Sequence, residues 1–225
     1  MNEIKNMTND IFELKTIIEK YSEDDEYKSY EVSPLLKRFI ELNETNLQEY
    51  NNAEDKNEQF LYDVCENFVF IGDTYRSMGR FSLSAKYFEK ALDASLILYC
   101  DHDVTLKDVD TLLYDVLKDR NYYVDDDCHD VLDKVKVTMM IDPNTVEKIE
   151  ESVMTRRRSF KHDPVEMSEE YLAVIDEVEE KVAKNRTLYG MGSCHEVWAL
   201  KEEYLLEKGI RWKSPAMLNP RVMFD

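Results

Sequence analysis

The sequence predicts an all-α protein, and two observations lead to this prediction. The chain of 225 residues contains only 5 glycines and 5 prolines, too few for the many turns of an all-β fold. Most prolines follow a serine or an aspartate directly, at Ser33-Pro34, Asp142-Pro143, Asp163-Pro164 and Ser214-Pro215. Serine and aspartate cap free N–H groups at a helix start, where proline has no N–H to lose. We therefore expect about eight or nine helices in antiparallel hairpins.

The N-terminal part, residues 1–53, is predicted to be a pair of helices. Apolar residues spaced three and four apart form one stripe on the first helix, and they are Ile4, Met7, Ile11, Leu14, Ile18 and Tyr21. After a polar link, Ser33-Pro34 is expected to open the second helix. Its expected buried face comprises Leu36, Phe39, Ile40, Leu47 and Tyr50.

The clearest local pattern runs from Phe68 to Leu92. One helix is expected from about residue 57 to residue 78 and a second from residue 81 to about residue 99, with Gly79-Arg80 as the turn between them. Gly72 and the small pair Ser84-Ala85 should let the two helix backbones approach closely, since larger side chains would hold them apart.

The spacing of aromatic and small residues in this hairpin follows a known repeat. The residues concerned are Ile71, Gly72, Tyr75, Gly79, Phe81, Ser84, Ala85, Phe88, Ala91 and Leu92. On these residues, segment 58–97 resembles a tetratricopeptide repeat, a hairpin of two packed helices. The resemblance implies a right-handed array of helix pairs that presents a surface to other proteins. A further pair of helices is expected at 104–118 and 127–140, and its residues do not superimpose well on the repeat. Together with the repeat, this pair makes a tetratricopeptide-like core over 54–140.

The C-terminal part, residues 141–225, is expected to hold helices at 144–158, 165–186 and 194–208. Ser193 and Glu196 have the spacing of a capping box, and Gly209 is placed to end the last helix. The apolar tail from Ile210 is expected to pack irregularly across the last hairpin. It is similar to tails of uncharacterised bacterial proteins, which implies no activity. The whole chain, 1–225, is interpreted as a single helical domain.

The charge and the cysteines of the chain narrow the range of partners and the compartment. The formal net charge of −19 disfavours nucleic acid and anionic membranes and favours a basic partner. No apolar run approaches the ~20 residues of a membrane-spanning helix. The four cysteines lie far apart, without a C-x-x-C pair, which favours a reducing cytoplasm.

Motifs for metals and cofactors are incomplete in this sequence. Cysteines and histidines lie close together at Cys100-Asp101-His102, Cys128-His129 and Cys194-His195. Adjacent helical residues project about 100° apart, so such pairs rarely chelate one ion. His195-Glu196 begins like a zinc-protease motif, but Ala199 stands where the second histidine is required. No calcium loop or phosphate-binding glycine loop is complete, and we expect neither a metal nor a cofactor.

The resemblance implies groove-facing positions on the first helix of the repeat. These positions are Glu66, Val69, Asp73, Arg76 and Ser77. Repeats that bind acidic peptide termini carry lysine and asparagine where this chain has Val69 and Asp73, which argues against an acidic ligand. We expect a cytoplasmic interaction or scaffolding module that binds an unknown, basic or neutral, peptide or protein through a helix-lined groove. The alternatives are that the C-terminal tail of the chain fills the groove, or that these residues only contact the next helix.

Two alternatives belong to other functional classes. In a thiol-dependent enzyme, Cys194 would lie in the first turn of a helix that stabilises its thiolate, with His162 or His195 as base. The other interpretation of Cys194 is a buried thiol. In a structural homo-oligomer, the apolar N-terminal stripe with Leu14 and Ile18 would be the interface between copies.

Overall fold

The computed structural model describes residues 2–22, 29–102, 109–120 and 160–224, and single positions at 144, 147, 148 and 151. Within these residues every regular element is a helix and there is no strand, which confirms the all-α class. The helix expected at 127–140, most of the one expected at 144–158, and Asp142-Pro143 lie outside the described residues. The chain divides into two compact units, which are described separately. The single domain expected over 1–225 stays a prediction.

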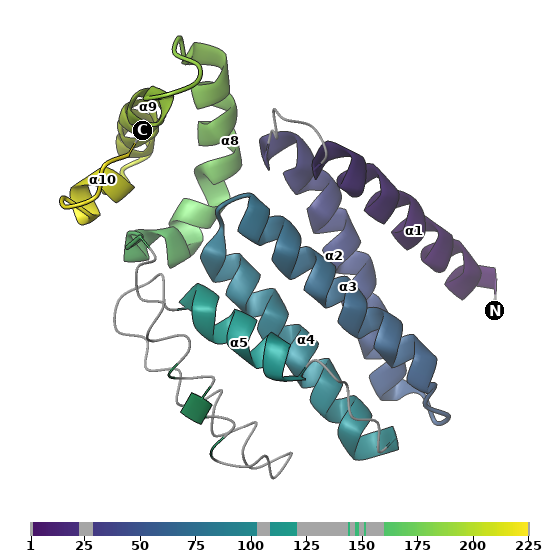
Figure 1. The fold of residues 1–225 in the computed structure, drawn as a ribbon. Helices are drawn as coiled ribbons and strands as arrows, with labels where there is room; N and C mark the ends of the chain where they lie inside the picture. Colours follow the sequence, from purple (N-terminus) through teal and green to yellow (C-terminus); the bar gives the residue numbers. More distant parts are fainter. Residues whose placement is uncertain are drawn as a thin grey trace. The chain divides into compact units, whose positions relative to one another are not determined.

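The first unit contains five helices in its described part (Figure 1). They are α1 (Asn2–Ser22), α2 (Ser29–Asn52), α3 (Glu58–Ser77), α4 (Phe81–His102) and α5 (Val109–Arg120). Each helix packs against the next one along the chain, and successive helices run in alternating directions. The antiparallel hairpins are therefore present, whereas a right-handed tetratricopeptide array stays a prediction.

The hairpin of α3 and α4 forms at the expected boundaries. Asn57 caps α3 by accepting a hydrogen bond from Phe60 N, and Gly79 adopts φ +69° in the turn. A Cβ atom at Gly72 would lie only 3.0 Å from the ring of Phe88, and the Ser84 hydroxyl donates to the Gly72 carbonyl at 2.8 Å. The small residues thus bring the two helices into direct contact, as the sequence predicts.

The core of the first unit uses the predicted apolar faces of α1 and α2. Ile11 and Ile18 of α1 are buried in the same cluster as Phe39 of α2 and Phe68 of α3. Two residues of the α1 stripe, Ile11 and Ile18, are therefore covered within the chain, while Leu14 is partly buried. The homo-oligomer alternative stays a prediction. Between α2 and α3, the buried amide of Asn43 donates to the carbonyl of Val64 at 3.2 Å.

The predicted start of α2 at Ser33-Pro34 is wrong. The helix begins at Ser29, and Pro34 lies inside it. Ser33 does not cap the helix, because its buried hydroxyl lies 3.5 Å from Arg80 Nη1. Proline this close to a helix start removes a single hydrogen bond, the one to the carbonyl of Tyr30, and the buried face that follows Pro34 stabilises the helix in spite of that loss.

The second unit contains η1 (Pro164–Met167), α8 (Glu169–Asn185), α9 (Ser193–Glu207) and α10 (Pro215–Leu218). Asp163 and Ser214 each cap the helix whose first turn holds the following proline, as expected. Gly209, with φ +82°, ends α9 as expected. The single helix expected at 165–186 is instead divided, because Ser168 is extended and caps a new helix through Tyr171 N.

The predicted capping box at Ser193 is also wrong. The residue before α9 is Gly192, in a left-handed conformation with φ +80°, and no side chain caps the helix. The carboxylate of Glu196 accepts instead from the backbone N–H groups of Thr187 and Leu188 at 2.6–3.1 Å. The Thr187 hydroxyl also donates to Glu196 Oε1 at 2.6 Å. This side-chain bond is the largest cause that lowers the pKa of Glu196, followed by the backbone bond of Leu188, and together the bonds fasten the loop between α8 and α9.

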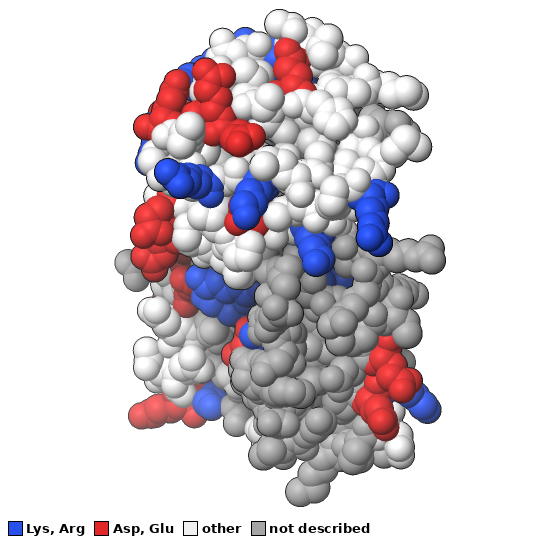
Figure 2. Space-filling view, turned by 90° about the vertical axis from the view of Figure 1, so that its left-hand side faces the viewer, with Lys and Arg blue, Asp and Glu red and all other residues white. Residues whose placement is uncertain are grey.

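The C-terminal tail packs on its own hairpin, as predicted. Ile210 and Trp212 are buried in one cluster with residues of α8 and α9, and the Phe224 ring lies edge-on to Trp198 at 5.0 Å. Residues 208–224 hold four lysines and arginines and no acidic residue. On the face shown in Figure 2, several basic side chains of the described residues stand apart from one another, and the acidic ones form small groups, the largest of them toward the left edge.

The close approach at Gly72 gives a test of the hairpin. Alanine usually stabilises a helical glycine position by about 1 kcal/mol. Here Gly72→Ala should instead destabilise the protein by about 1–2 kcal/mol in urea unfolding, because the ring of Phe88 must move. In a Phe88→Leu background the same change should cost less. Stabilisation by Gly72→Ala in the wild-type background would contradict the packing.

Candidate functional site

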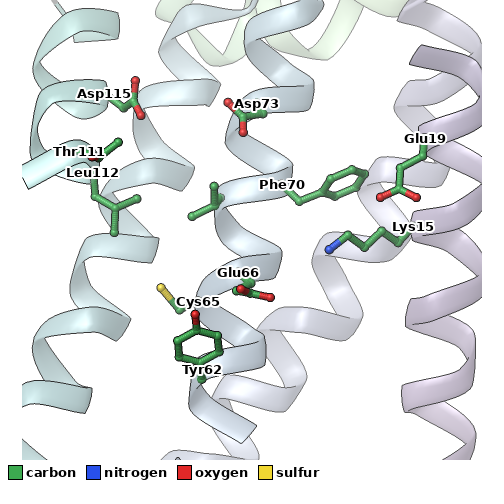
Figure 3. A pocket seen from close by; sticks show the side chains of 11 residues that line it. Lys15, Glu19, Tyr62, Cys65, Glu66, Phe70, Asp73, Thr111, Leu112 and Asp115 are labelled. Carbon is green, nitrogen blue, oxygen red and sulfur yellow. The ribbon is translucent and has the colours of Figure 1, made fainter. Parts of the chain in front are cut away.

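A pocket of about 460 Å³ lies in the first unit, between α1, α3 and α5. Helix α3 passes through the middle of the site, with α1 on one side and α5 on the other (Figure 3). The lining residues are Lys15, Glu19, Tyr62, Cys65, Glu66, Val69, Phe70, Asp73, Thr111, Leu112 and Asp115. The volume falls within the roughly 300–1,000 Å³ of typical ligand pockets.

The pocket combines apolar surface with negative charge. Tyr62, Val69, Phe70 and Leu112 supply aromatic and aliphatic surface. Among the described lining residues, four carboxylates stand against a single lysine, Lys15. The ammonium group of this lysine lies over the ring of Phe70, 5.1 Å from its centroid. The pocket therefore offers apolar surface together with more carboxylates than cations among its described lining residues, and this combination favours a cationic ligand.

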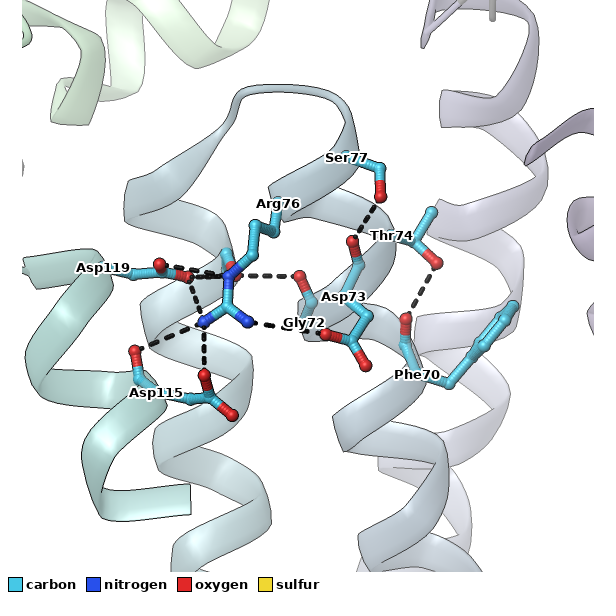
Figure 4. Close-up of polar contacts among 9 residues, drawn as sticks. Phe70, Gly72, Asp73, Thr74, Arg76, Ser77, Asp115 and Asp119 are labelled. Carbon is cyan, nitrogen blue, oxygen red and sulfur yellow. Dashed lines mark hydrogen bonds and ion pairs between the residues drawn. The ribbon is translucent and has the colours of Figure 1, made fainter. Parts of the chain in front are cut away.

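Three of the five predicted groove residues line this pocket. Glu66, Val69 and Asp73 point into it from α3, and Glu66 and Asp73 are exposed. The other two residues have different roles. The Ser77 hydroxyl donates to the carbonyl of Asp73 at 3.0 Å within α3, and Arg76 turns toward α5 (Figure 4).

Arg76 forms the strongest polar contacts between α3 and α5. Its Nε donates to both carboxylate oxygens of Asp119 at 3.0 and 3.1 Å, and its Nη2 donates to Asp115 Oδ1 at 3.0 Å. Nη1 lies 3.6 Å from Asp73, and the guanidinium covers the ring of Phe88 at 4.5 Å. The side chain of Arg76 is thus half-buried and paired with carboxylates of α3 and α5.

The acidic partners of Arg76 were missed by the sequence reasoning, although Asp119 carries a signal. It continues the stripe of Leu112 and Val116, at positions where a buried residue is expected, and its side chain is fully buried. Burial raises the pKa of Asp119 despite the opposing effects of Ser84 and Arg76. Burial alone would lower the pKa of the Arg76 guanidinium. Attraction by Asp119 and Asp115 outweighs this effect and raises the pKa.

Cys65 lines the pocket as a protonated thiol. Burial raises its pKa to about 11, and its Sγ lies 3.3 Å from the carbonyl of Ala91 and 3.2 Å from the hydroxyl of Ser95. Nucleophilic cysteines need a lowered pKa. This thiol therefore contributes packing and no nucleophile.

Cys194, the residue of the enzyme alternative, is half-buried in the first turn of α9. Both histidines proposed as its base bind other groups. His162 Nδ1 lies 3.3 Å from the carboxylate of Glu166, and His195 Nε2 donates to the carbonyl of Phe224 at 3.2 Å and packs against Trp198. These contacts favour a structural role for both histidines.

A buried polar cluster in the second unit was also missed by the sequence reasoning. Glu166 accepts from Trp212 Nε1 at 2.7 Å. Lys201 lies 3.6 Å from Glu179 and over the rings of Tyr171 and Trp212. Burial alone would raise the pKa of Glu166, but the hydrogen bond of His162 and the charge of Lys201 lower it. The cluster joins the tail to α8 and α9.

Two features are absent from the described part of the chain, a cluster of metal-ligating side chains and a membrane-crossing helix. No three histidine, cysteine, aspartate or glutamate side chains there come together in a group that could hold a metal ion. No helix in the same ranges combines the length and the apolar content needed to cross a membrane.

Comparisons of the chain with protein-family models, with curated proteins and with solved structures find no match. The tetratricopeptide resemblance accordingly rests on the residues of α3 and α4.

Removing the guanidinium of Arg76 tests the contact between α3 and α5. Arg76→Met leaves the buried carboxylate of Asp119 without its cation, and should lower the free energy of unfolding by about 3 kcal/mol in urea titrations followed by circular dichroism. Adding Asp119→Asn should recover part of the loss. Arg38→Met is the control, since its ion pair with Glu41 is exposed and should cost less than about 0.5 kcal/mol. Equal losses of unfolding free energy in Arg76→Met and Arg38→Met would refute the role of Arg76 in holding α3 to α5.

The lowered pKa of Glu166 predicts an acid-sensitive second unit. A carboxylate with a depressed pKa in the fold adds stability above its unfolded pKa, and this stability is lost as pH falls through the folded pKa. Tryptophan fluorescence reports on this unit alone, because both tryptophans lie in it. Glu166→Gln should therefore be less stable near neutral pH and should lose less stability on acidification. If the stability of the wild type and of Glu166→Gln changed with pH in parallel, the lowered pKa of Glu166 would be contradicted.

Proposed function

We propose that the protein is an interaction module that binds a basic peptide segment in the pocket between α1, α3 and α5. The observation that carries the proposal is the combination of apolar surface with four carboxylates against a single lysine among the described lining residues. Of these carboxylates, Asp115 is paired with Arg76, and the remaining three still exceed the lysine. The proposal includes a tetratricopeptide-like arrangement of the hairpins and a cytoplasmic setting.

The arrangement of the helices supports this function. Among the described residues, the pocket is lined by α1, α3 and α5 and by none of α2 and α4. The lining helices are therefore alternate helices of the row. Repeat proteins built from helical hairpins present one helix of each pair to the ligand in the same way. The groove-facing positions that the resemblance implies, Glu66, Val69 and Asp73, belong to this lining.

The charges support a basic ligand over an acidic one. A carboxylate of the peptide would meet Glu66 and Asp73, and like charges at such distances weaken binding. A lysine or arginine side chain would find hydrogen-bond acceptors, while apolar neighbours in the peptide would cover Val69 and Leu112. Because several pairs of opposite charge form, the affinity should fall as salt is added.

Fluorescence anisotropy with a labelled decapeptide of alternating leucine and lysine tests the proposal. The peptide should bind saturably, and a version with glutamate in place of lysine should not. Glu66→Gln with Asp73→Asn should weaken binding about tenfold, because two attractive charges are lost. Both side chains are exposed, so the fold should be retained.

The control is Glu13→Gln with Glu49→Gln, which removes the same charge from exposed positions outside the pocket lining. These changes should leave the affinity within about twofold of the wild type. If both double variants lowered the peptide affinity equally, the interaction would depend only on the net charge of the protein and not on the pocket. Absence of binding by the lysine peptide would overturn the proposed function.

A further inference from the structure

We infer that Lys15 is an internal competitor in this pocket, and that its ammonium group occupies the subsite in which a primary ammonium group of the peptide ligand binds. This inference rests on the proposed function and specifies the chemistry that the pocket recognises. According to this inference, Lys15 weakens the binding of the peptide, and replacing Lys15 should raise the affinity for the peptide.

The position of the lysine shows what the subsite binds. Lys15 Nζ lies 5.1 Å from the centroid of the Phe70 ring, within the distance at which a cation is attracted by the face of an aromatic ring. The ring is held in place by an edge-to-face contact with Phe39, at 5.5 Å and 70°. The subsite is therefore a fixed aromatic surface that already carries an ammonium group.

The surrounding charges favour a cation at the same point. In Figure 3, the side chain of Lys15 reaches from α1 toward α3, with Glu19 drawn above it and Glu66 drawn on α3 below it. Glu19 and Glu66 both line the pocket. The ring that binds the ammonium group of Lys15 would bind the ammonium group of a peptide equally, because the two groups are chemically the same, and the carboxylates of the lining would favour either cation.

The guanidinium group of Arg76 binds α5 and not the Phe70 ring. We therefore assign the subsite at Phe70 to an ammonium group. Arg76 binds Asp115 and Asp119 and covers Phe88 on the far side of α3. Asp115, the carboxylate of the α5 wall, is therefore already paired with an arginine. The ligand's cation is left with the region around Phe70, where the existing cation is a lysine on a flexible stem.

Two cations cannot share this region without repulsion. A ligand ammonium group must displace Lys15 or bind a few ångströms from it. Lys15→Gln removes the competing charge, and it should raise the affinity for the leucine–lysine decapeptide about tenfold at low salt. Lys15→Arg keeps a cation at the site and should stay within about twofold of the wild type.

Lys20→Gln is the matched control. Lys20 is an exposed residue of the same helix, outside the pocket lining, and its replacement changes the net charge by the same amount. Its affinity should remain within about twofold of the wild type. Lys15→Met, which also lacks the charge but keeps a long apolar side chain, serves as a second variant should the glutamine protein fold poorly.

Anisotropy titrations of the five proteins separate the possible outcomes, with thermal unfolding as a check on the fold. Tighter binding by Lys15→Gln and Lys15→Met alone supports the inference. Weaker or unchanged binding by these variants, or an equal gain by Lys20→Gln, overturns it and leaves the proposed function intact. If the decapeptide binds none of the proteins, the proposed function itself is wrong.

Discussion

The ion pairs of Arg76 hold the first unit together at the point where three helices meet. The guanidinium pairs with two aspartates of α5, one of them fully buried, while it lies on Phe88 of α4. Without this cation, Asp115 and Asp119 would repel each other one turn apart on α5. The pocket depends on the same contact, because Asp115 is part of its α5 wall.

The sequence predicts the hairpin of α3 and α4 well because its determinants are local. The cap at Asn57, the turn at Gly79 and the close approach at Gly72 each need only residues of the hairpin itself. The two faces of α3 also follow from its periodicity. Gly72 faces α4, whereas Glu66 and Asp73, seven residues apart, line the pocket.

The features that the sequence did not predict depend on contacts between distant residues. Arg76 was expected in the groove, but its partners lie about forty residues away, 43 for Asp119. Ser193 was expected to cap α9, but a preceding left-handed glycine sets the helix start and Glu196 binds the loop instead. In both cases a plausible local pattern gave way to a stronger hydrogen-bonding partner elsewhere in the fold.

The burial of Trp212 has a consequence for synthesis on the ribosome. The hairpin of α8 and α9 completes its core only when Ile210 and Trp212 have packed against it. A chain grows from its N-terminus at roughly 5–20 residues per second, and its earlier parts fold first. Until the tail emerges, Ile175 and Leu205 of the nascent hairpin lack part of their cover. A transcript truncated before codon 210 would therefore yield a chain with a permanently open second core, a substrate for chaperones and proteases.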